Sequence, residues 1–309
     1  MKKIWTAILL CISMASCAAA ESAHTAVPGG APVAFVDAAG RGVTVKSHSR
    51  VVAASGSFAQ TWLLAGGRLA ASTEDAFGEY SGVDPDTVKN IGLLKNPSLE
   101  LIFACKPDFV ILSADIQGHG SLREQLEAAG ITTAYFSVET FGEYLDMLKI
   151  CTDITGRDDL YERNGAAIQS QINAAVARSA GKDPAAVLLV RSYSSGVSAK
   201  GSDNMTGAML KDLGCVNIAD SENSLLDELS MEIIIREDPD FIFVTTMGDG
   251  REKALETLRA GIQANPAWQE LSAVKNGRYH VLPKELFHLK PNNRWGESYE
   301  ILADILYGA

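Results

Sequence analysis

Three loops of this sequence carry side chains that can recognise a charged or aromatic ligand. Arg191 directly follows the apolar run of residues 186–190, and its planar guanidinium suits the carboxylate or other oxyanion groups of a chelate. Its alternative role is a structural ion pair at the edge of the domain. Ser57 follows a short predicted strand, residues 50–54, and Tyr80 lies farther along the chain. Because ligands of α/β sheets bind beyond the C-terminal ends of the strands, these loops predict one shared site.

Aromatic and basic residues follow in the second and third loops. Tyr193 and Trp295 could stack on an aromatic chelate or a macrocycle, or they could pack inside the protein. Arg294 could lie over the ligand or cap the last helix. His288 could ligate iron, including the iron of haem with Tyr80 as its partner across the site, although a lone loop histidine is more often a solvated polar residue.

The sequence shows no recognisable catalytic or metal-binding constellation. Segments 54–58 and 191–196 lack the G-x-S-x-G pattern of a hydrolase elbow, and no Walker loop is present. A bare metal ion needs several clustered ligands, whereas the histidines are scattered. They are His24, His48, His119, His280 and His288. We therefore expect a binding protein that is not an enzyme, with no catalytic residues, no metal ion and no cofactor of its own.

The cysteines and the net charge argue against further classes of protein. Cys105, Cys151 and Cys215 are odd in number and form no C-x-x-C pair, which favours small buried side chains over a disulfide framework or a zinc site. The formal net charge is −11. Such a chain repels phosphate backbones, so nucleic-acid binding is not expected, while a local basic pocket for an anionic ligand remains possible.

The N-terminus reads as an export signal. Lys2 and Lys3 precede an apolar segment, residues 4–12, which is too short to span a bilayer. Met14, Ala15, Ser16 and Cys17 then resemble a bacterial lipobox, which predicts a signal peptide over 1–16 and a lipidated Cys17. An ordinary signal peptide cut after residues 18–20 is the alternative. The Ala-, Ser-, Gly- and Pro-rich residues 17–32 predict a flexible tether.

The elements that must position the candidate residues alternate between strand and helix. This alternation predicts an α/β fold of two pseudo-equivalent lobes joined by one long helix, with a ligand cleft between them. The predicted N-terminal lobe covers 33–157, the linking helix 158–181 and the C-terminal lobe 182–309. Segment 99–110, with its Lys-Pro-Asp turn, matches segment 231–242, with its Asp-Pro-Asp turn. The predicted strands are 33–37, 42–45, 50–54, 109–112, 131–136, 186–190 and 241–244, and the predicted helices are 57–65, 99–104, 121–129, 158–180, 206–213 and 231–236.

In the order and spacing of these pieces, residues 33–309 resemble the helix-linked (class III) substrate-binding proteins of ABC importers for ferric siderophores, haem and vitamin B12. The matching pieces are the hairpin 36–44, the strand that begins at Arg50, segment 96–100, the two Pro-Asp turns and Gly130-Ile131. The resemblance implies two α/β lobes that hold a ligand between them with little hinge motion. An exported enzyme or sensor on the same bilobal fold is the alternative from another class.

The resemblance also implies a ligand class and partners. We expect a ferric siderophore first, haem second and cobalamin third, captured by a monomer on the outer side of a bacterial membrane and anchored there by Cys17. In the family, one acidic residue on each lobe meets the membrane subunits of the importer, and Glu100 and Glu232 match those positions. Each glutamate could instead stabilise the helix in which it lies.

Overall fold

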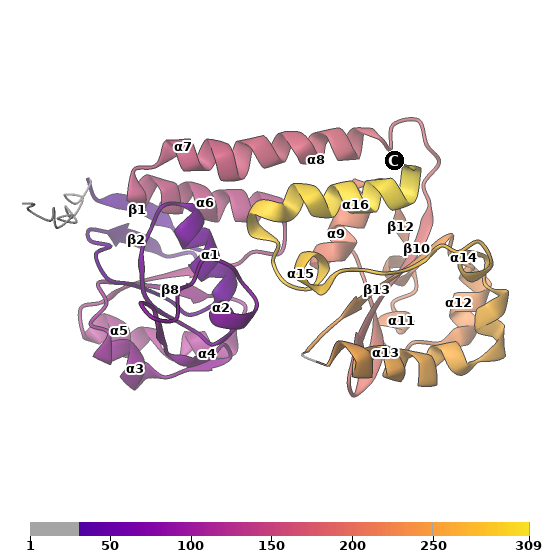
Figure 1. Cartoon of the computed structure of the whole chain (residues 1–309), viewed down its shortest axis with the longest axis horizontal. Helices are drawn as coiled ribbons and strands as arrows, with labels where there is room; N and C mark the ends of the chain where they lie inside the picture. The colour runs from indigo at the N-terminus through magenta and orange to yellow at the C-terminus, as the bar shows by residue number, and fades with distance from the viewer. Residues whose placement is uncertain (1–30, 249, 309) are drawn as a thin grey trace, which may run out of the picture.

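The structure is a computed structural model that describes residues 31–248 and 250–308. The predicted signal peptide 1–16, Cys17 and the tether up to residue 30 lie outside the described residues. Figure 1 shows two lobes side by side, the N-terminal one in indigo and magenta and the C-terminal one in salmon to yellow. The predicted two-lobed α/β fold is confirmed.

The N-terminal lobe is built on a parallel five-stranded sheet in the order β5-β4-β3-β8-β9. Its strands are β3 (Val51–Ala53), β4 (Leu69–Ser72), β5 (Lys89–Asn90), β8 (Phe109–Ser113) and β9 (Thr132–Phe136). The predicted hairpin is present as β1 (Val33–Val36) and β2 (Gly42–Val45), and β6 (Gly92–Leu93) pairs with β7 (Asn96–Pro97). The helices are α1 (Gly56–Leu64), α2 (Asp75–Gly78), α3 (Leu99–Ala104), α4 (Gln117–Gly120), α5 (Arg123–Ala128) and α6 (Phe141–Thr155).

The C-terminal lobe has its own sheet, in the order β11-β10-β13-β14, with β12 beside β10. The strands are β10 (Ala186–Tyr193), β11 (Gly196–Lys200), β12 (Val216–Asn217), β13 (Phe241–Thr246) and β14 (Tyr279–Val281). The α-helices are α9 (Met205–Asp212), α10 (Ile218–Ser221), α11 (Ser224–Asp227), α12 (Met231–Glu237), α13 (Arg251–Ala260), α14 (Ser272–Lys275), α15 (Lys284–Phe287) and α16 (Trp295–Tyr307). Short 3-10 turns are η2 (Ile262–Ala264), η3 (Pro266–Glu270) and η4 (Asn292–Arg294).

A long helical segment joins the lobes and runs along one edge of the molecule (Figure 1). It comprises α7 (Asp158–Tyr161), a π-helical turn η1 (Glu162–Ala166) and α8 (Ala167–Ala177). The helix predicted over 158–180 is therefore present but ends at Ala177. Gly165 lies in the π turn, where a Cβ atom would approach Leu145 Cδ2 to 2.9 Å, so glycine allows this turn to pack closely on α6.

The internal repeat seen in the sequence is also a structural repeat. Lys106 and Asp238 both adopt positive φ angles, 49° and 38°, and they lie two residues after α3 and one residue after α12. The aspartates at the end of the two turns make equivalent backbone hydrogen bonds. Asp108 N donates to Arg50 O (3.1 Å), and Asp240 N donates to Ala186 O (2.8 Å). Each carboxylate also accepts the backbone N–H of that same partner residue. The two Pro-Asp turns therefore tie equivalent parallel strands together in the two lobes.

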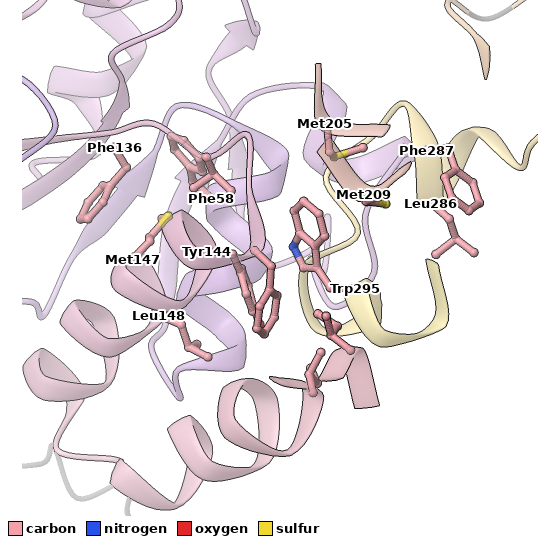
Figure 2. Close-up of a cluster of buried hydrophobic side chains, with 14 of the residues drawn as sticks. Phe58, Phe136, Tyr144, Met147, Leu148, Met205, Met209, Leu286, Phe287 and Trp295 are labelled. Atoms are coloured by element: carbon pink, nitrogen blue, oxygen red, sulfur yellow. The ribbon is translucent and has the colours of Figure 1, made fainter. Parts of the chain in front are cut away.

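Alternate residues of each sheet pack into different cores. In the N-terminal sheet Val52 and Val110 face a core of that lobe alone, and in the C-terminal sheet Leu188 and Ile242 do the same. The opposite faces join one core that continues across both lobes through α1, α6, α9 and α16. Figure 2 shows Trp295 of α16 in this shared core, between Tyr144 of α6 and Met209 of α9. The lobes are thus held together by buried apolar contact as well as by the linking helix.

One predicted boundary is wrong in a way that affects the site. The strand predicted over 186–190 continues to Tyr193 and turns back as the antiparallel strand β11, so Arg191 pairs with Ser198 and Thr245 inside the sheet. Ser57 likewise belongs to the first turn of α1, which begins at Gly56. Across the described ranges 31–248 and 250–308, the structure contains no helix with the length and apolar character needed to cross a bilayer.

Candidate ligand-binding site

A cavity of about 830 Å³ lies where the two lobes meet. It is formed by the loops that follow β3, β4, β8 and β9 in the N-terminal lobe and by the loop after β13 and the segment around α15 in the C-terminal lobe. The charged and polar lining residues are Ser55, Ser57, Glu74, Asp75, Glu79, Tyr80, Lys95, Ser113, Asp115, Glu139, Lys284, His288 and Lys290. The apolar ones are Phe58, Leu93, Leu94, Ile116, Met247 and Leu289.

The N-terminal wall is organised around the start of α1. Gly56 N donates to Asp75 Oδ2 (2.8 Å), which ties α1 to α2. A Cβ atom at Gly56 would lie 2.6 Å from Tyr80 Cδ2 and 2.7 Å from Ala76 N, so only glycine allows this close packing. Burial raises the pKa of Tyr80, and the nearby Asp75 and Glu79 raise it further, so its hydroxyl stays protonated. Ser57 and Tyr80 both line the cavity.

Buried polar atoms without a protein partner occur on both walls. Asp75 Oδ1 has none on the N-terminal side, and His288 Nδ1 has none on the C-terminal side, among the residues that the structure describes. Buried polar groups are normally hydrogen-bonded, and leaving one unsatisfied costs about 1–3 kcal/mol. The residues that carry these atoms line the cavity.

His288 follows α15 and is neutral at physiological pH. Burial lowers its pKa to about 4, and the neighbouring Arg191, Lys284 and Lys290 also disfavour the protonated ring. A neutral imidazole has one donor and one acceptor nitrogen and can also ligate a metal. His288 and Tyr80 both line the cavity, from opposite lobes.

Arg191 lies near the site without lining the cavity. It is half-buried on β10, and its Nε has no partner in the part of the chain that the structure describes. Burial lowers its pKa, while Glu139 of the other lobe opposes that change, and its charge is felt at His288. Arg191 therefore supplies positive charge close to the C-terminal wall, and a direct contact with a ligand remains a prediction.

The structure does not bring the three other aromatic and basic candidates to the cavity. Trp295 is 1% exposed and packs edge-to-face on Phe141, with ring centroids 6.0 Å apart, because α16 turns its first residue into the shared core. Arg294 forms a bidentate ion pair with Glu297 at the start of the same helix (2.7 and 2.8 Å). Tyr193 lies against the tight turn at Gly196, where a Cβ atom would come within 3.0 Å of its ring. Arg294 occupies the N-cap position of α16, but its side chain makes no cap hydrogen bond and pairs with Glu297, while Trp295 packs inside the protein.

Polar contacts between the lobes fix the position of one cavity wall relative to the other. Lys284 pairs with Glu79 (2.8 Å) and Lys290 pairs with Glu139. Asn292 has a positive φ of 52° and is 1% exposed, and its Nδ2 donates to Ser57 O (3.2 Å) and Gln60 Oε1 (2.6 Å) of α1. The C-terminal segment 284–292 therefore contributes residues to the cavity and fixes the helix that forms the opposite wall.

Sequence reasoning missed the acidic residues of the N-terminal wall and one structural histidine. Glu74, Asp115 and Glu139 follow β4, β8 and β9, so the rule that selected Ser57 would have found them had it been applied to every strand. His119 is buried, accepts Ser113 N–H at Nδ1 (2.9 Å) and contacts Leu94 O through Nε2 (2.8 Å). It holds two lining loops together, and no sequence pattern marks it.

The glutamates predicted to dock on a transporter are not among the residues that line the cavity. Glu100 is exposed in the first turn of α3, where Ser98 caps the helix by accepting Leu101 N–H (3.3 Å). Glu232 is exposed in the first turn of α12. Figure 1 shows α3 and α12 on different lobes.

Cys105, Cys151 and Cys215 are buried free thiols, and no group of three potential metal ligands occurs within residues 31–248 and 250–308.

Comparison with known proteins identifies two curated relatives from Bacillus subtilis. The chain is 27% identical over 192 residues to the Fe(3+)-citrate-binding protein YfmC, covering 62% of this chain and 58% of the relative. It is 25% identical over 208 residues to the putative ABC transporter substrate-binding lipoprotein YhfQ, covering 63% and 62% of the two chains. The aligned regions thus span about three fifths of the length of these relatives.

Solved structures share the fold at low sequence identity. The siderophore-binding protein BauB, bound to two acinetobactin molecules and ferric iron, matches with a TM-score of 0.70 and 19% identity over 90% of this chain and 98% of its own. The periplasmic haem-binding protein HutB of Vibrio cholerae matches with a TM-score of 0.69 and 21% identity over 84% and 100%. These relatives are named as binding proteins and not as enzymes. The sequence model for the periplasmic binding protein family matches residues 51–286, about three quarters of the chain. This chain therefore belongs to the periplasmic binding protein family.

Proposed function

We propose that the protein captures an iron chelate outside the cytoplasm and delivers it to the membrane subunits of an ABC importer. The observation that carries this proposal is the cavity of about 830 Å³ between the lobes, which is in the usual range for small-ligand sites. Buried, unpartnered polar atoms on both of its walls, Asp75 Oδ1 and His288 Nδ1, support a ligand that contacts both lobes at once.

A ferric siderophore is the first choice of ligand. The curated relative YfmC is named for ferric citrate, and the similar fold of BauB holds a ferric siderophore. The lining offers hydroxyl, carboxylate, ammonium and imidazole groups, a polar set that suits the oxygen-rich surface of a chelate.

Haem is the second candidate, and a specific observation favours it. Tyr80 and His288 both line the cavity and come from opposite lobes, and either side chain can serve as an axial ligand of haem iron. The HutB structure is that of a haem-binding protein. Cobalamin ranks third; its binding protein BtuF of Vibrio cholerae shares the fold with a TM-score of 0.64.

The proposal places the protein on a membrane surface as a lipid-anchored monomer. Cys17→Ala should release the protein from the membrane fraction into the soluble or secreted fraction, because the lipid is the proposed anchor. Cys11→Ala, in the apolar part of the same signal, is the control and should leave the protein in the membrane fraction. Equal distribution of wild type and Cys17→Ala between the fractions would contradict the anchor.

The proposed function is tested by what the protein holds when it is isolated from its own cells. Protein purified without denaturation from iron-limited cells should carry an iron-containing small molecule. A siderophore and haem are then separated by their visible absorption, since haem alone gives a Soret band.

A further inference from the structure

The two walls of the cavity differ in charge. The N-terminal wall contributes five carboxylates and one ammonium group, Lys95. The C-terminal wall contributes Lys284, Lys290 and the neutral His288, with no carboxylate among its described residues. The described lining as a whole therefore holds five carboxylates against three ammonium groups. The five carboxylates are those of Glu74, Asp75, Glu79, Asp115 and Glu139.

Both lysines of the C-terminal wall are already matched by carboxylates of the other lobe. Lys284 pairs with Glu79 at 2.8 Å, and Lys290 pairs with Glu139. These contacts cross the cavity boundary from one lobe to the other, so the positive charge of the C-terminal wall is partly neutralised before any ligand enters.

The remaining acidic side chains are not matched in this way. Glu74, Asp75 and Asp115 form no ion pair with any residue in the described ranges. Asp115 accepts a hydrogen bond from Ser137 Oγ (2.9 Å), and Asp75 accepts one from Gly56 N, while Asp75 Oδ1 is buried without a partner. An ionised carboxylate accepts hydrogen bonds and donates none. This wall therefore offers several open acceptor positions.

A second observation indicates that this wall faces a ligand. Asp75 lines the cavity and its Oδ1 is buried without a hydrogen-bond partner among the described residues, and Ser57 beside it in the lining is 4% exposed. At the rim, the exposed apolar side chains of Leu93 and Met247 come from opposite lobes, 56% and 41% exposed. The site therefore combines an acidic wall, a lysine-bearing wall and an apolar rim.

We propose that the ligand is a ferric chelate of zero or positive net charge that carries a protonated amine. The amine faces Glu74, Asp75 and Asp115, and the anionic oxygens that bind the metal face Lys284 and Lys290. This inference rests on the proposed function, because it assumes that the cavity takes an iron chelate. A strongly anionic chelate is disfavoured, because it would meet more carboxylates than ammonium groups in the cavity lining.

The test compares three ferric chelates of different charge by titration into the purified full chain. The probes are ferrioxamine B, a hydroxamate chelate with a free ammonium group, ferrichrome, which is neutral, and ferric citrate, which is anionic. We expect ferrioxamine B to bind at least about tenfold more tightly than ferric citrate, with ferrichrome between them. The readout is the dissociation constant from protein fluorescence or calorimetry at one fixed salt concentration.

A charge-neutralised variant shows whether the acidic wall causes this order. Glu74→Gln with Asp115→Asn should weaken ferrioxamine B about tenfold or more and leave ferric citrate unchanged or tighter. The matched control is Asp86→Asn with Glu124→Gln, two exposed side chains outside the cavity lining, which should preserve the order. Tightest binding of ferric citrate, or an unchanged order in the cavity variant, would overturn this inference and leave the proposed function standing. Failure of all three chelates to bind would contradict both.

Discussion

Replacing Glu100 and Glu232 together by arginine is expected to abolish uptake while leaving the fold and the ligand affinity nearly unchanged. Both glutamates are exposed, each in the first turn of a short helix, and the two helices belong to different lobes. Charge complementarity sets orientation and association rate at protein interfaces, and like charges placed against each other suppress binding. An arginine on each lobe would therefore oppose the basic partner that the family resemblance implies.

The surroundings of both glutamates support an interface. Leu101 and Phe103 on α3 are 45% and 37% exposed, and Ile235 on α12 is 44% exposed. Each glutamate thus lies beside exposed apolar side chains, and exposed apolar patches with polar residues around them mark interaction sites. The cost to the fold should be small, because a carboxylate in a first helical turn contributes about 0.3–1 kcal/mol through the helix dipole.

The experiment measures uptake of radioactive iron, supplied as the chelate that co-purifies, in cells that carry only the variant. Glu124→Arg with Glu252→Arg is the matched control, because these glutamates are also exposed in first helical turns, of α5 and α13, one on each lobe. The control should transport normally. Normal uptake by the Glu100 and Glu232 double variant would refute the docking assignment.

Trp295→Ala is expected to lower the free energy of unfolding by about 3–5 kcal/mol and to uncouple the two lobes. Trp295 is 1% exposed and contacts the N-terminal lobe through Phe141, in the core that the lobes share (Figure 2). Each lobe also has a core of its own. Loss of the shared contact should therefore give a broad or two-step denaturation curve in place of one cooperative transition, and ligand affinity should fall because the cavity needs both walls.

Trp268→Ala is the matched control for this prediction. Trp268 is 3% exposed and packs edge-to-face on Tyr279 (5.8 Å between centroids), inside the core of the C-terminal lobe. It should destabilise that lobe by a similar amount without touching the contact between lobes. The contrary outcome is a Trp295→Ala protein with unchanged stability and weakened ligand binding, which would make Trp295 a ligand-stacking residue.

Local sequence signals predicted most elements because those signals have local causes. The Ala-Ala-Gly-Arg turn, the Pro-Asp turns and the apolar runs fix the hairpin, the repeat and the strands through backbone geometry and burial within a few residues. The sequence predicts that β10 ends at Val190, because Arg191 interrupts the apolar run. In the structure, pairing with β11 and β13 extends the strand to Tyr193. Sheet pairing of this kind depends on distant residues and leaves little trace in the segment itself.

The site was predicted in part for the same reason. Ser57, Tyr80 and His288 line the cavity. They lie in loops that follow strands or in the segment before the last helix, which is where the sequence argument looked for ligand contacts. Trp295 and Arg294 precede a helix whose first turn enters the core, and whether an aromatic side chain faces a ligand or the interior depends on how α16 packs on α6 and α9. The acidic wall was overlooked because single carboxylates in separate loops form no motif until the sheet brings the loops together.

The native mass spectrum of protein isolated from iron-limited cells tests the central claim most directly. We predict one added mass per protein molecule, and that mass should contain iron and match a siderophore or haem in the visible spectrum. An added mass that contains no metal would contradict the account, as would protein that stays ligand-free after incubation with ferric siderophores and haem.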